Sequence, residues 1–270
     1  MKKVLSLILV LALMCTVFVA CEKKDELTED EAKGNVEVAS DLAYIQDKGT
    51  MIVGITDYEP MNYKDEAGEW TGFDTEFALL VAEKLGVDVE FIEIDWDGKI
   101  MELDSNSIDC VWNGMTLTDE VMKGMNCSDP YVMNAQVVVA AADKIADIAA
   151  VEDLEGLTLV AESGSAGEAA IKDAGFECTA VLTQADALLE VKSGSADACV
   201  IDITMANAMT GEGTSYADLA SGISLTEEFY GIGFRKDSDV TAEVNKIMDE
   251  LIADGTLPAL AEKYELTLAE

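Results

Sequence analysis

Short apolar runs alternate with segments of helical periodicity from Met51 onward. Residues 51–55 form an apolar run, whereas residues 73–85 place apolar side chains three and four positions apart and stop at Gly86, a common residue at helix C-termini. Strands that alternate with helices indicate an α/β fold with a largely parallel sheet. The pattern predicts strands at 51–55, 87–94, 108–112, 136–141, 157–161 and 198–203, and helices at 73–85, 99–103, 167–174 and 185–192.

A weak internal repeat suggests two similar lobes. Residues 105–111 and 193–200 each run from a helix end, through a small polar turn and an aspartate, into an apolar strand. Ligands of open α/β sheets bind at the carboxyl ends of the strands. The residues directly after these strands are therefore candidate ligand contacts, namely Asn113, Gly114, Met115 and Thr116 in one lobe and Asp202 in the other.

The first residues form a targeting signal. Two lysines precede an apolar run from Val4 to Ala20, which ends at Cys21 and a strongly charged segment. This order is typical of a cleaved signal peptide, here residues 1–20. No later segment approaches the roughly 20 apolar residues that a membrane-spanning helix requires.

Cys21 is the expected lipid attachment site. The sequence Phe18-Val19-Ala20-Cys21 resembles a bacterial lipobox, although Phe18 stands where leucine is usual. The resemblance implies a lipoprotein, acylated with chains such as palmitate, on the extracytoplasmic face of the bacterial cell membrane. A secretory signal cut nearby or an uncleaved anchor is the alternative. Residues 21–40 then form the lipidated cysteine and a flexible acidic tether.

Four cysteines remain beyond this segment. Two disulfides are possible in an oxidising compartment, but buried free thiols are the simpler interpretation, and no short cysteine spacing has the form of a metal site. We therefore expect no metal and no cofactor. The four residues are Cys110, Cys127, Cys178 and Cys199.

Composition excludes several classes of function. The 270 residues carry 54 Asp and Glu against 17 Lys and Arg, a net charge of −37, with no histidine. Such a chain repels a phosphate backbone, which argues against nucleic-acid binding. Without histidine, Ser-His-Asp and Cys-His nucleophile pairs and histidine-ligated zinc are impossible. The 50% of hydrophobic residues suffices for buried cores, and the length suits two domains or one large one.

Several short motifs follow the signal in a fixed order. They are Gly72-Phe73-Asp74, Asp95-Trp96-Asp97, Ile108-Asp109, Gly114-Met115-Thr116-Leu117-Thr118, Ser128-Asp129-Pro130-Tyr131, Asp153-Leu154-Glu155-Gly156, Gly164-Ser165-Ala166-Gly167, Tyr230-Gly231-Ile232-Gly233-Phe234-Arg235-Lys236 and Asp254-Gly255-Thr256. Together they resemble the type II periplasmic solute-binding proteins of amino-acid ABC importers, the bacterial extracellular solute-binding proteins of family 3. The resemblance covers most of residues 44–266.

The resemblance implies a two-lobed type II periplasmic binding protein fold. Two α/β lobes would be joined by two crossing strands, near 136–139 and 231–233, and would trap a ligand by hinge closure. Lobe 1 would comprise residues 41–136 plus 232–270. Lobe 2 would comprise residues 137–231.

In lobe 1, the resemblance implies five ligand-binding residues. Tyr58 and Trp96 match positions at which aromatic rings sandwich the ligand side chain, and both ring faces attract cations. Asn113, Gly114 and Thr116 match the ligand loop, where backbone groups and the Thr116 hydroxyl meet the ammonium and carboxylate of the ligand. Core packing and a plain polar turn are the alternatives.

In lobe 2, the resemblance implies four more ligand-binding residues. Ser165 and Ala166 match a turn before a helix whose N–H groups contact the ligand carboxylate. Asp202 matches the carboxylate that pairs with the α-amino group. Glu162 precedes the turn where side-chain specificity is often decided. A simple helix cap, a solvated aspartate and an exposed edge residue are the respective alternatives.

One departure from the family concerns the ligand carboxylate. The family places an arginine three residues after the second threonine of its Thr-x-Thr motif, where this chain has Val121. Arg235, the single arginine, falls in the part expected to return to lobe 1 away from the cleft. The carboxylate would then rest on N–H groups, hydroxyls or a lysine such as Lys123. Alternatively, the ligand lacks an α-carboxylate and is more cationic.

The expected function is capture without catalysis. The protein would be a monomeric substrate-binding lipoprotein that takes up a polar amino acid or related amine-bearing solute and delivers it to ABC permease subunits, with the membrane contacted through the lipid anchor alone. Two alternatives remain, a dehydratase acting on cyclohexadienyl substrates on the same fold and the ligand-sensing module of a signalling receptor.

Overall fold

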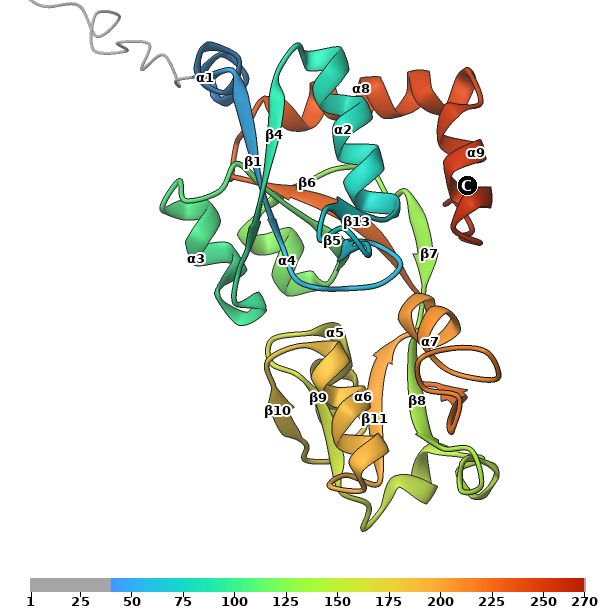
Figure 1. Ribbon diagram of the computed structural model, residues 1–270. Coiled ribbons are helices and arrows are strands. Elements are labelled where there is room, and N and C mark those ends of the chain that lie inside the picture. Colours follow the sequence, from blue (N-terminus) through green and yellow to red (C-terminus); the bar gives the residue numbers. More distant parts are fainter. Residues whose placement is uncertain (1–39, 270) are drawn as a thin grey trace, which may run out of the picture. The chain divides into compact units, whose positions relative to one another are not determined.

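The computed structural model describes residues 40–269, which belong to one structural unit. The predicted signal peptide, Cys21 and the acidic tether up to Ala39 lie outside the described residues. Ser40 is the N-cap of the first helix, because its hydroxyl accepts a hydrogen bond from the Ala43 N–H. Two β-sheets, each with its own helices, form the body of the unit (Figure 1).

The first sheet defines lobe 1 and has the strand order β4-β1-β5-β13-β6, with β7 also paired to β13. Strand β1 runs parallel to β4 and β5, whereas β13 runs antiparallel to β5, β6 and β7. The strands are β1 (Thr50–Ile55), β4 (Asp88–Glu93), β5 (Cys110–Thr116), β6 (Asn126–Cys127), β7 (Val132–Asn134) and β13 (Glu228–Phe234). A separate hairpin pairs β2 (Tyr63–Lys64) with β3 (Trp70–Thr71).

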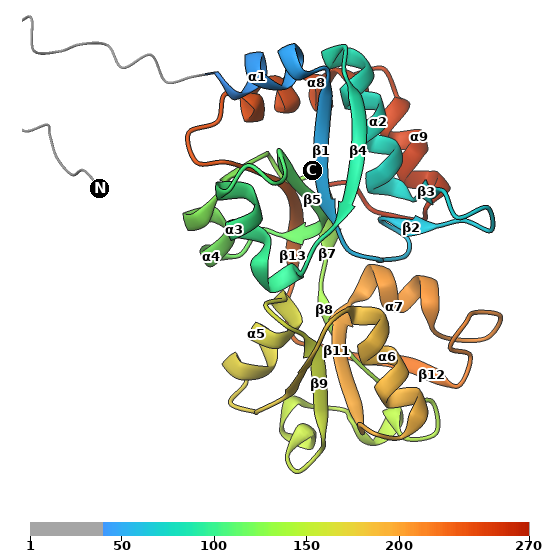
Figure 2. The ribbon, with the colours of Figure 1, turned by 60° about the vertical axis from the view of Figure 1, so that its left-hand side comes forward.

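Helices cover both faces of this sheet (Figure 2). Strand side chains alternate between faces, so Cys110 and Trp112 join the core beneath α2, whereas Val111 and Met115 join the cluster beside α3 and α4. Helix α2 ends where Gly86 adopts a left-handed φ of 75°. The helices are α1 (Asp41–Lys48), α2 (Phe73–Leu85), η1 (Trp96–Gly98), α3 (Lys99–Asp104), α4 (Asp119–Gly124), α8 (Val240–Ala253) and α9 (Thr256–Lys263).

The second sheet defines lobe 2 and has the order β10-β9-β11-β8-β12. Strand β9 is parallel to β10 and β11, and β8 is antiparallel to β11 and β12. The strands are β8 (Gln136–Ala141), β9 (Leu159–Glu162), β10 (Thr179–Val181), β11 (Ala198–Asp202) and β12 (Leu219–Ser224). The helices are η2 (Ile145–Asp147), η3 (Val151–Leu154), α5 (Ala166–Asp173), α6 (Gln184–Ser193) and α7 (Ile203–Met209).

The chain changes sheets twice. It leaves the first sheet after β7 and enters the second at β8, so that Ala135 is the link, and it returns between β12 and β13. The crossings were expected near 136–139 and 231–233; the second lies earlier, before Glu228. Because β8 and β13 run against their neighbours, both sheets are mixed. The prediction of a largely parallel sheet is therefore wrong, whereas the two-lobed α/β prediction is confirmed.

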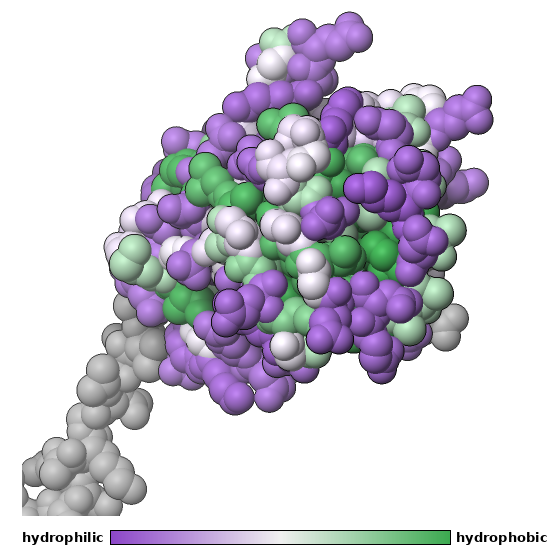
Figure 3. Space-filling model, turned by 90° about the horizontal axis from the view of Figure 1, so that it is seen from below, coloured by the Kyte–Doolittle hydropathy of each residue, from purple (hydrophilic) through white to green (hydrophobic). Residues whose placement is uncertain are grey.

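The surface of the described residues agrees with a strongly charged sequence. Figure 3 shows hydrophilic residues spread over the face seen from below, with apolar residues between them. None of the helices between residues 40 and 269 is both long and apolar enough to cross a membrane.

Candidate functional site

A cavity of about 600 Å³ lies between the two lobes. Lobe 1 contributes residues of η1, α3, β5 and α4, and lobe 2 contributes residues of β9, α5, α6 and β11. Carboxyl ends of strands meet there, as expected for a ligand site of α/β sheets. Of the nine residues expected to bind ligand, the cavity brings together Trp96, Asn113, Gly114, Thr116, Glu162, Ser165, Ala166 and Asp202.

Tyr58 is the exception, because it does not line the cavity. Its ring is 2% exposed, and its hydroxyl is hydrogen-bonded to the hydroxyls of Thr204 and Tyr230. The ring lies behind Gly114: a Cβ atom on that residue would come within 2.6 Å of Tyr58 Cε1. Tyr58 therefore supports the loop from the protein side, and Gly114, with a φ of 56°, allows the close approach.

The donors of the lobe 1 loop are bonded inside the protein. The Asn113 side-chain amide donates to Thr56 Oγ1 at 2.7 Å, and the Gly114 N–H donates to Asp74 Oδ2 at 2.6 Å. The Thr116 hydroxyl donates to Glu228 Oε1 at 2.7 Å. The loop was expected to offer these donors to a ligand carboxylate. In this structure they hold the loop in shape instead.

Glu162 provides a buried carboxylate at the end of β9. It is 2% exposed, and its Oε1 atom has no hydrogen-bond partner among the described residues. Burial and then the negative charge of Asp202 raise the pKa of Glu162 to about 8, against the opposing effect of the Lys99 ammonium. Its free oxygen can accept a hydrogen bond from a cation in the cavity.

Asp202, at the end of β11, lies in a network of buried amides. Its Oδ1 accepts from the side chains of Asn134 and Gln136, the latter at 2.8 Å, and its Oδ2 accepts from Gln184. The same two amides of the crossing segment donate to Glu228 Oε1, at 2.7 and 2.6 Å. Burial, followed by the charge of Glu228, raises the pKa of Asp202 to about 7. The network joins a cavity carboxylate to the strands that connect the lobes.

Sequence reasoning missed Glu228, which also lines the cavity. It begins β13, two residues before Tyr230 in a recognised motif. An acidic residue at a strand end beside that motif is the signal that could have identified it.

Ser165 and Ala166 lie at the N-terminus of α5. The Ser165 hydroxyl accepts a hydrogen bond from the Glu168 N–H at 3.1 Å, so this side chain caps the helix. The first N–H groups of a helix lack partners within it and favour anions. The start of α5 thus brings helix N–H groups to the edge of the cavity, beside the Glu168 carboxylate, which accepts a hydrogen bond from the Gly164 N–H at 3.1 Å.

Lys99 is the second residue that sequence reasoning missed. It begins α3, lines the cavity and is 7% exposed. Its ammonium donates to the Trp96 carbonyl at 3.1 Å and to the Gly164 carbonyl at 2.9 Å, and it lies 4.8 Å from the centre of the Trp96 ring. Burial lowers the pKa of Lys99, and the charges of Glu120 and Glu162 oppose this effect. The suggested alternative, Lys123, does not line the cavity.

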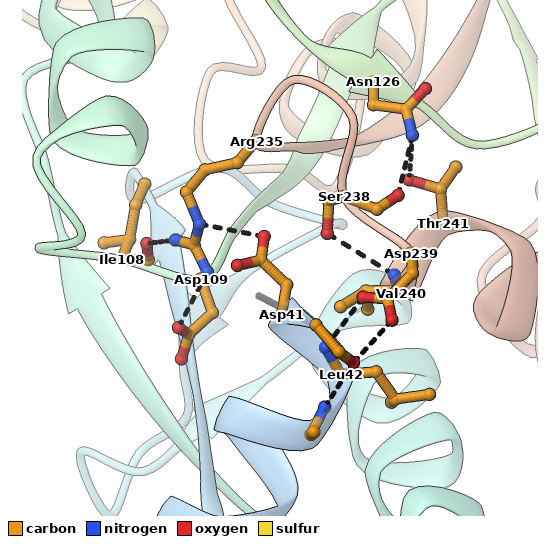
Figure 4. A network of polar contacts seen from close by, with 12 residues as sticks. Asp41, Leu42, Ile108, Asp109, Asn126, Arg235, Ser238, Asp239, Val240 and Thr241 are labelled. Atoms are coloured by element: carbon orange, nitrogen blue, oxygen red, sulfur yellow. Dashed lines mark hydrogen bonds and ion pairs between the residues drawn. The ribbon is translucent and has the colours of Figure 1, made fainter. Parts of the chain in front are cut away.

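Arg235 lies away from the cavity, as predicted. Its guanidinium donates to Asp41 Oδ2 at 3.0 Å and to the Ile108 carbonyl at 2.8 Å, and it faces Asp109 Oδ1 at 3.5 Å (Figure 4). It thereby ties α1 to the sheet of lobe 1. Val121, which does line the cavity, packs into the apolar cluster beside α3.

The described residues contain no group of three or more His, Cys, Asp or Glu side chains arranged to hold a metal ion. The four cysteines between residues 40 and 269 are free; Cys110 and Cys199 are buried, whereas Cys127 and Cys178, also expected to be buried, are half-buried. Burial raises the pKa of the Cys110 and Cys199 thiols far above the usual range, which leaves them unreactive.

Comparison with known proteins identifies the family. Residues 51–267 match the model of the bacterial extracellular solute-binding proteins, family 3. The chain belongs to this family. It is 31% identical to the L-cystine-binding protein TcyA of Bacillus subtilis, over 98% of this chain and 97% of that protein. The predicted solute-binding role and two-lobed type II fold are therefore confirmed.

Two solved structures define the similarity further. An ancestral arginine-binding protein bound to arginine is 36% identical, with a TM-score of 0.74, and the match covers 80% of this chain and 98% of that one. The ancestral amino acid-binding protein AncCDT-1, a precursor of cyclohexadienyl dehydratase, is 34% identical, with a TM-score of 0.76 and coverages of 83% and 99%. Both are named as binding proteins, and the second is a precursor of an enzyme.

Proposed function

We propose that this protein captures a polar amino acid or a related amine-bearing solute between its lobes and delivers it to the permease of an ABC importer. The proposal includes a lipid anchor at Cys21, an extracytoplasmic position and a monomeric state. Relatives named for the binding of cystine, arginine and glutamine support the class of ligand.

The unpartnered Oε1 atom of Glu162 is the observation that carries the proposal. A buried carboxylate oxygen without a donor is costly, and a ligand ammonium would supply both charge and hydrogen bond. Asp202 and Glu228 add negative charge to the same cavity, and Trp96 adds an aromatic surface. These groups favour a ligand that carries a cationic group.

Eight residues form the proposed cavity wall in contact with, or next to, the solute. They are Trp96, Asn113, Gly114, Thr116, Glu162, Ser165, Ala166 and Asp202. Tyr58 is assigned a supporting role instead. Contacts already cross the cleft, since the Lys99 ammonium on lobe 1 reaches the Gly164 carbonyl on lobe 2. The solute is enclosed when the lobes approach about the two crossing segments.

A thermal-shift panel tests the proposal. Purified residues 22–270 are heated with arginine, lysine, histidine, glutamine, cystine, putrescine and choline. A solute at about 100-fold excess over its Kd adds about 2.7 kcal/mol to the free energy of unfolding. We expect a rise in melting temperature with at least one amine-bearing solute and none with succinate. If no amine-bearing compound stabilises the protein, the proposed ligand class is wrong.

A further inference from the structure

Lys99 is a buried cation whose ammonium donates hydrogen bonds, among the described residues, to two backbone carbonyls and to no side chain. An ammonium has three N–H donors, and two of them bond to the carbonyls of Trp96 and Gly164. Within residues 40–269 Lys99 forms no ion pair, since no carboxylate oxygen lies within 4.0 Å of its Nζ atom. One N–H therefore remains for an anion, while the Trp96 ring at 4.8 Å and the more distant charges of Glu120, Glu162 and Asp97 offset part of the positive charge.

This ammonium lies next to the N-terminus of α5. The Gly164 carbonyl that Lys99 contacts at 2.9 Å directly precedes Ser165, the N-cap of that helix. A lysine from lobe 1 and the unpaired N–H groups of a helix from lobe 2 thus converge on one side of the cavity. The hydroxyl and N–H donors of the lobe 1 loop are already bonded to Thr56, Asp74 and Glu228, so they do not compete for an anion there.

Glu162 supplies the opposite charge in the same cavity. Its Oε1 atom has no donor, and the two side chains influence each other through space without forming an ion pair. When Glu162 is ionised, its carboxylate and the Lys99 ammonium are buried opposite charges, each with an unused hydrogen-bonding atom, and a ligand that carries both signs stabilises this ionised state.

We propose that Lys99 binds the carboxylate of the solute while Glu162 holds an amine, so that the cavity selects zwitterionic amino acids over amines without a carboxylate. This inference rests on the proposed function and sharpens it. Because the Lys99 ammonium contacts carbonyls of both lobes, a carboxylate bound there is held at the point where the lobes meet.

Other cations of the described chain do not suit this role. Lys172 lines the cavity but is exposed and pairs with Glu168 at 2.7 Å. Lys123 is 78% exposed and pairs with Asp119. Arg235 is bonded at the α1 junction.

Paired solutes test the inference by titration calorimetry. Arginine and agmatine share a guanidinium, and lysine and cadaverine share a primary amine, but the second of each pair lacks the carboxylate. A hydrogen bond between charged groups corresponds to roughly 10- to 100-fold in affinity. We expect the native protein to bind at least one amino acid more tightly than its decarboxylated partner by that factor. Lys99→Met should abolish the preference and change the affinity for the amine by less than about threefold.

Lys123→Met is the matched control, since it removes an exposed lysine outside the cavity, and it should retain the preference. If Lys99→Met lowers the affinity for the amino acid and for its decarboxylated partner equally, the lysine only holds the lobes together, and the inference is overturned. If that variant does not fold, arginine against argininamide in the native protein decides, because equal affinities would exclude a carboxylate contact. If the native protein binds none of these solutes, the proposed function itself fails.

Discussion

At the junction of α1, β1 and β5, the carboxylate of Asp109 accepts hydrogen bonds from Lys48 Nζ at 2.6 Å and from the Ile52 N–H at 2.8 Å, and it faces Arg235. In the cavity, the carboxylate of Glu162 is just as buried, yet one of its oxygens has no partner. In both regions a carboxyl group is removed from water. The fold supplies partners for Asp109, whereas it leaves one oxygen of Glu162 without a partner.

The difference separates structural from functional charge. Around Asp109 the chain supplies two cations and a backbone donor, so the charges are neutralised within the fold. Figure 4 shows the contact of Arg235 with Asp109. In the cavity, Glu162 and Lys99 lie on different lobes and do not form an ion pair. Burial of a charge without its partner lowers stability, and a ligand can return that free energy on binding. The three predictions that follow test whether this distinction holds.

Removal of a charge from the Asp109 region should have the largest effect, a loss of folding stability. Arg235→Met removes a cation that is 11% exposed and leaves Asp41 and Asp109 with fewer partners. Loss of one member of a buried ion pair typically costs about 3 kcal/mol or more, partly offset here because Lys48 remains. We expect the free energy of unfolding in urea to fall by about 2–3 kcal/mol, with unchanged Kd for any solute that binds.

Lys246→Met is the control for Arg235→Met, because Lys246 is exposed and pairs with Glu243 on the surface of α8. Its cost should be below about 0.5 kcal/mol. An equal loss in both variants, or altered solute affinity in Arg235→Met, would contradict the assignment of the Asp109 region to structure alone.

A change at Glu162 in the cavity should have the reverse effect, lowering the affinity for solute without lowering the stability of the free protein. Glu162→Gln keeps the shape of the side chain but removes the charge that a ligand amine would meet. We expect affinity for an amine-bearing solute to fall roughly 10- to 100-fold. The ligand-free protein should unfold in urea at the same or a higher concentration, because the substitution removes a buried ionisable group.

Asp119→Asn offers a control at the exposed rim of the same cavity. Its charge is screened by water and salt, so affinity should change by less than about threefold. If Glu162→Gln destabilises the free protein as much as Arg235→Met does, Glu162 has a structural partner and the contrast between the two regions disappears.

The same distinction explains which features the sequence could predict. Local patterns predicted α2 and β8 to the residue, and ordered motifs predicted the carboxyl-end residues from Trp96 to Asp202 that line the cavity. These features depend on neighbouring positions or on short recognisable segments. The prediction of free cysteines also followed from their apolar surroundings.

Long-range contacts were not predictable in this way. Tyr58 is directed away from the cavity by hydroxyls of Thr204 and Tyr230, 146 and 172 positions along the chain. Lys99 opens a short helix, where a lysine is ordinarily solvated, and its burial depends on Gly164 of the other lobe. The antiparallel direction of β13 likewise arises from the return of the chain between lobes.

The smallest expected effect concerns protons, and it compares the free and occupied states of the cavity. The pKa of Glu162 is raised from 4.5 to about 8, so below pH 8 its carboxyl mostly holds a proton in the free protein. An ammonium in contact favours the ionised form and lowers this pKa, and binding therefore releases up to one proton near pH 7. Affinity for an amine-bearing solute should rise by up to about tenfold from pH 6 to pH 7 and level off above pH 8.

The raised pKa of Glu162 affects folding stability in the opposite sense, because the folded free protein binds this proton more tightly than the unfolded chain does. The stabilisation is complete below pH 4.5 and is lost as the pH rises through 8. Calorimetric titrations in two buffers of different ionisation enthalpy measure the proton release directly. Asp202, with a pKa raised to about 7, contributes in the same direction, so Glu162→Gln should reduce the release without abolishing it. Affinity that stays constant between pH 6 and pH 8, with no proton released, would mean that no cation approaches Glu162 and that its unpartnered oxygen is not a ligand contact.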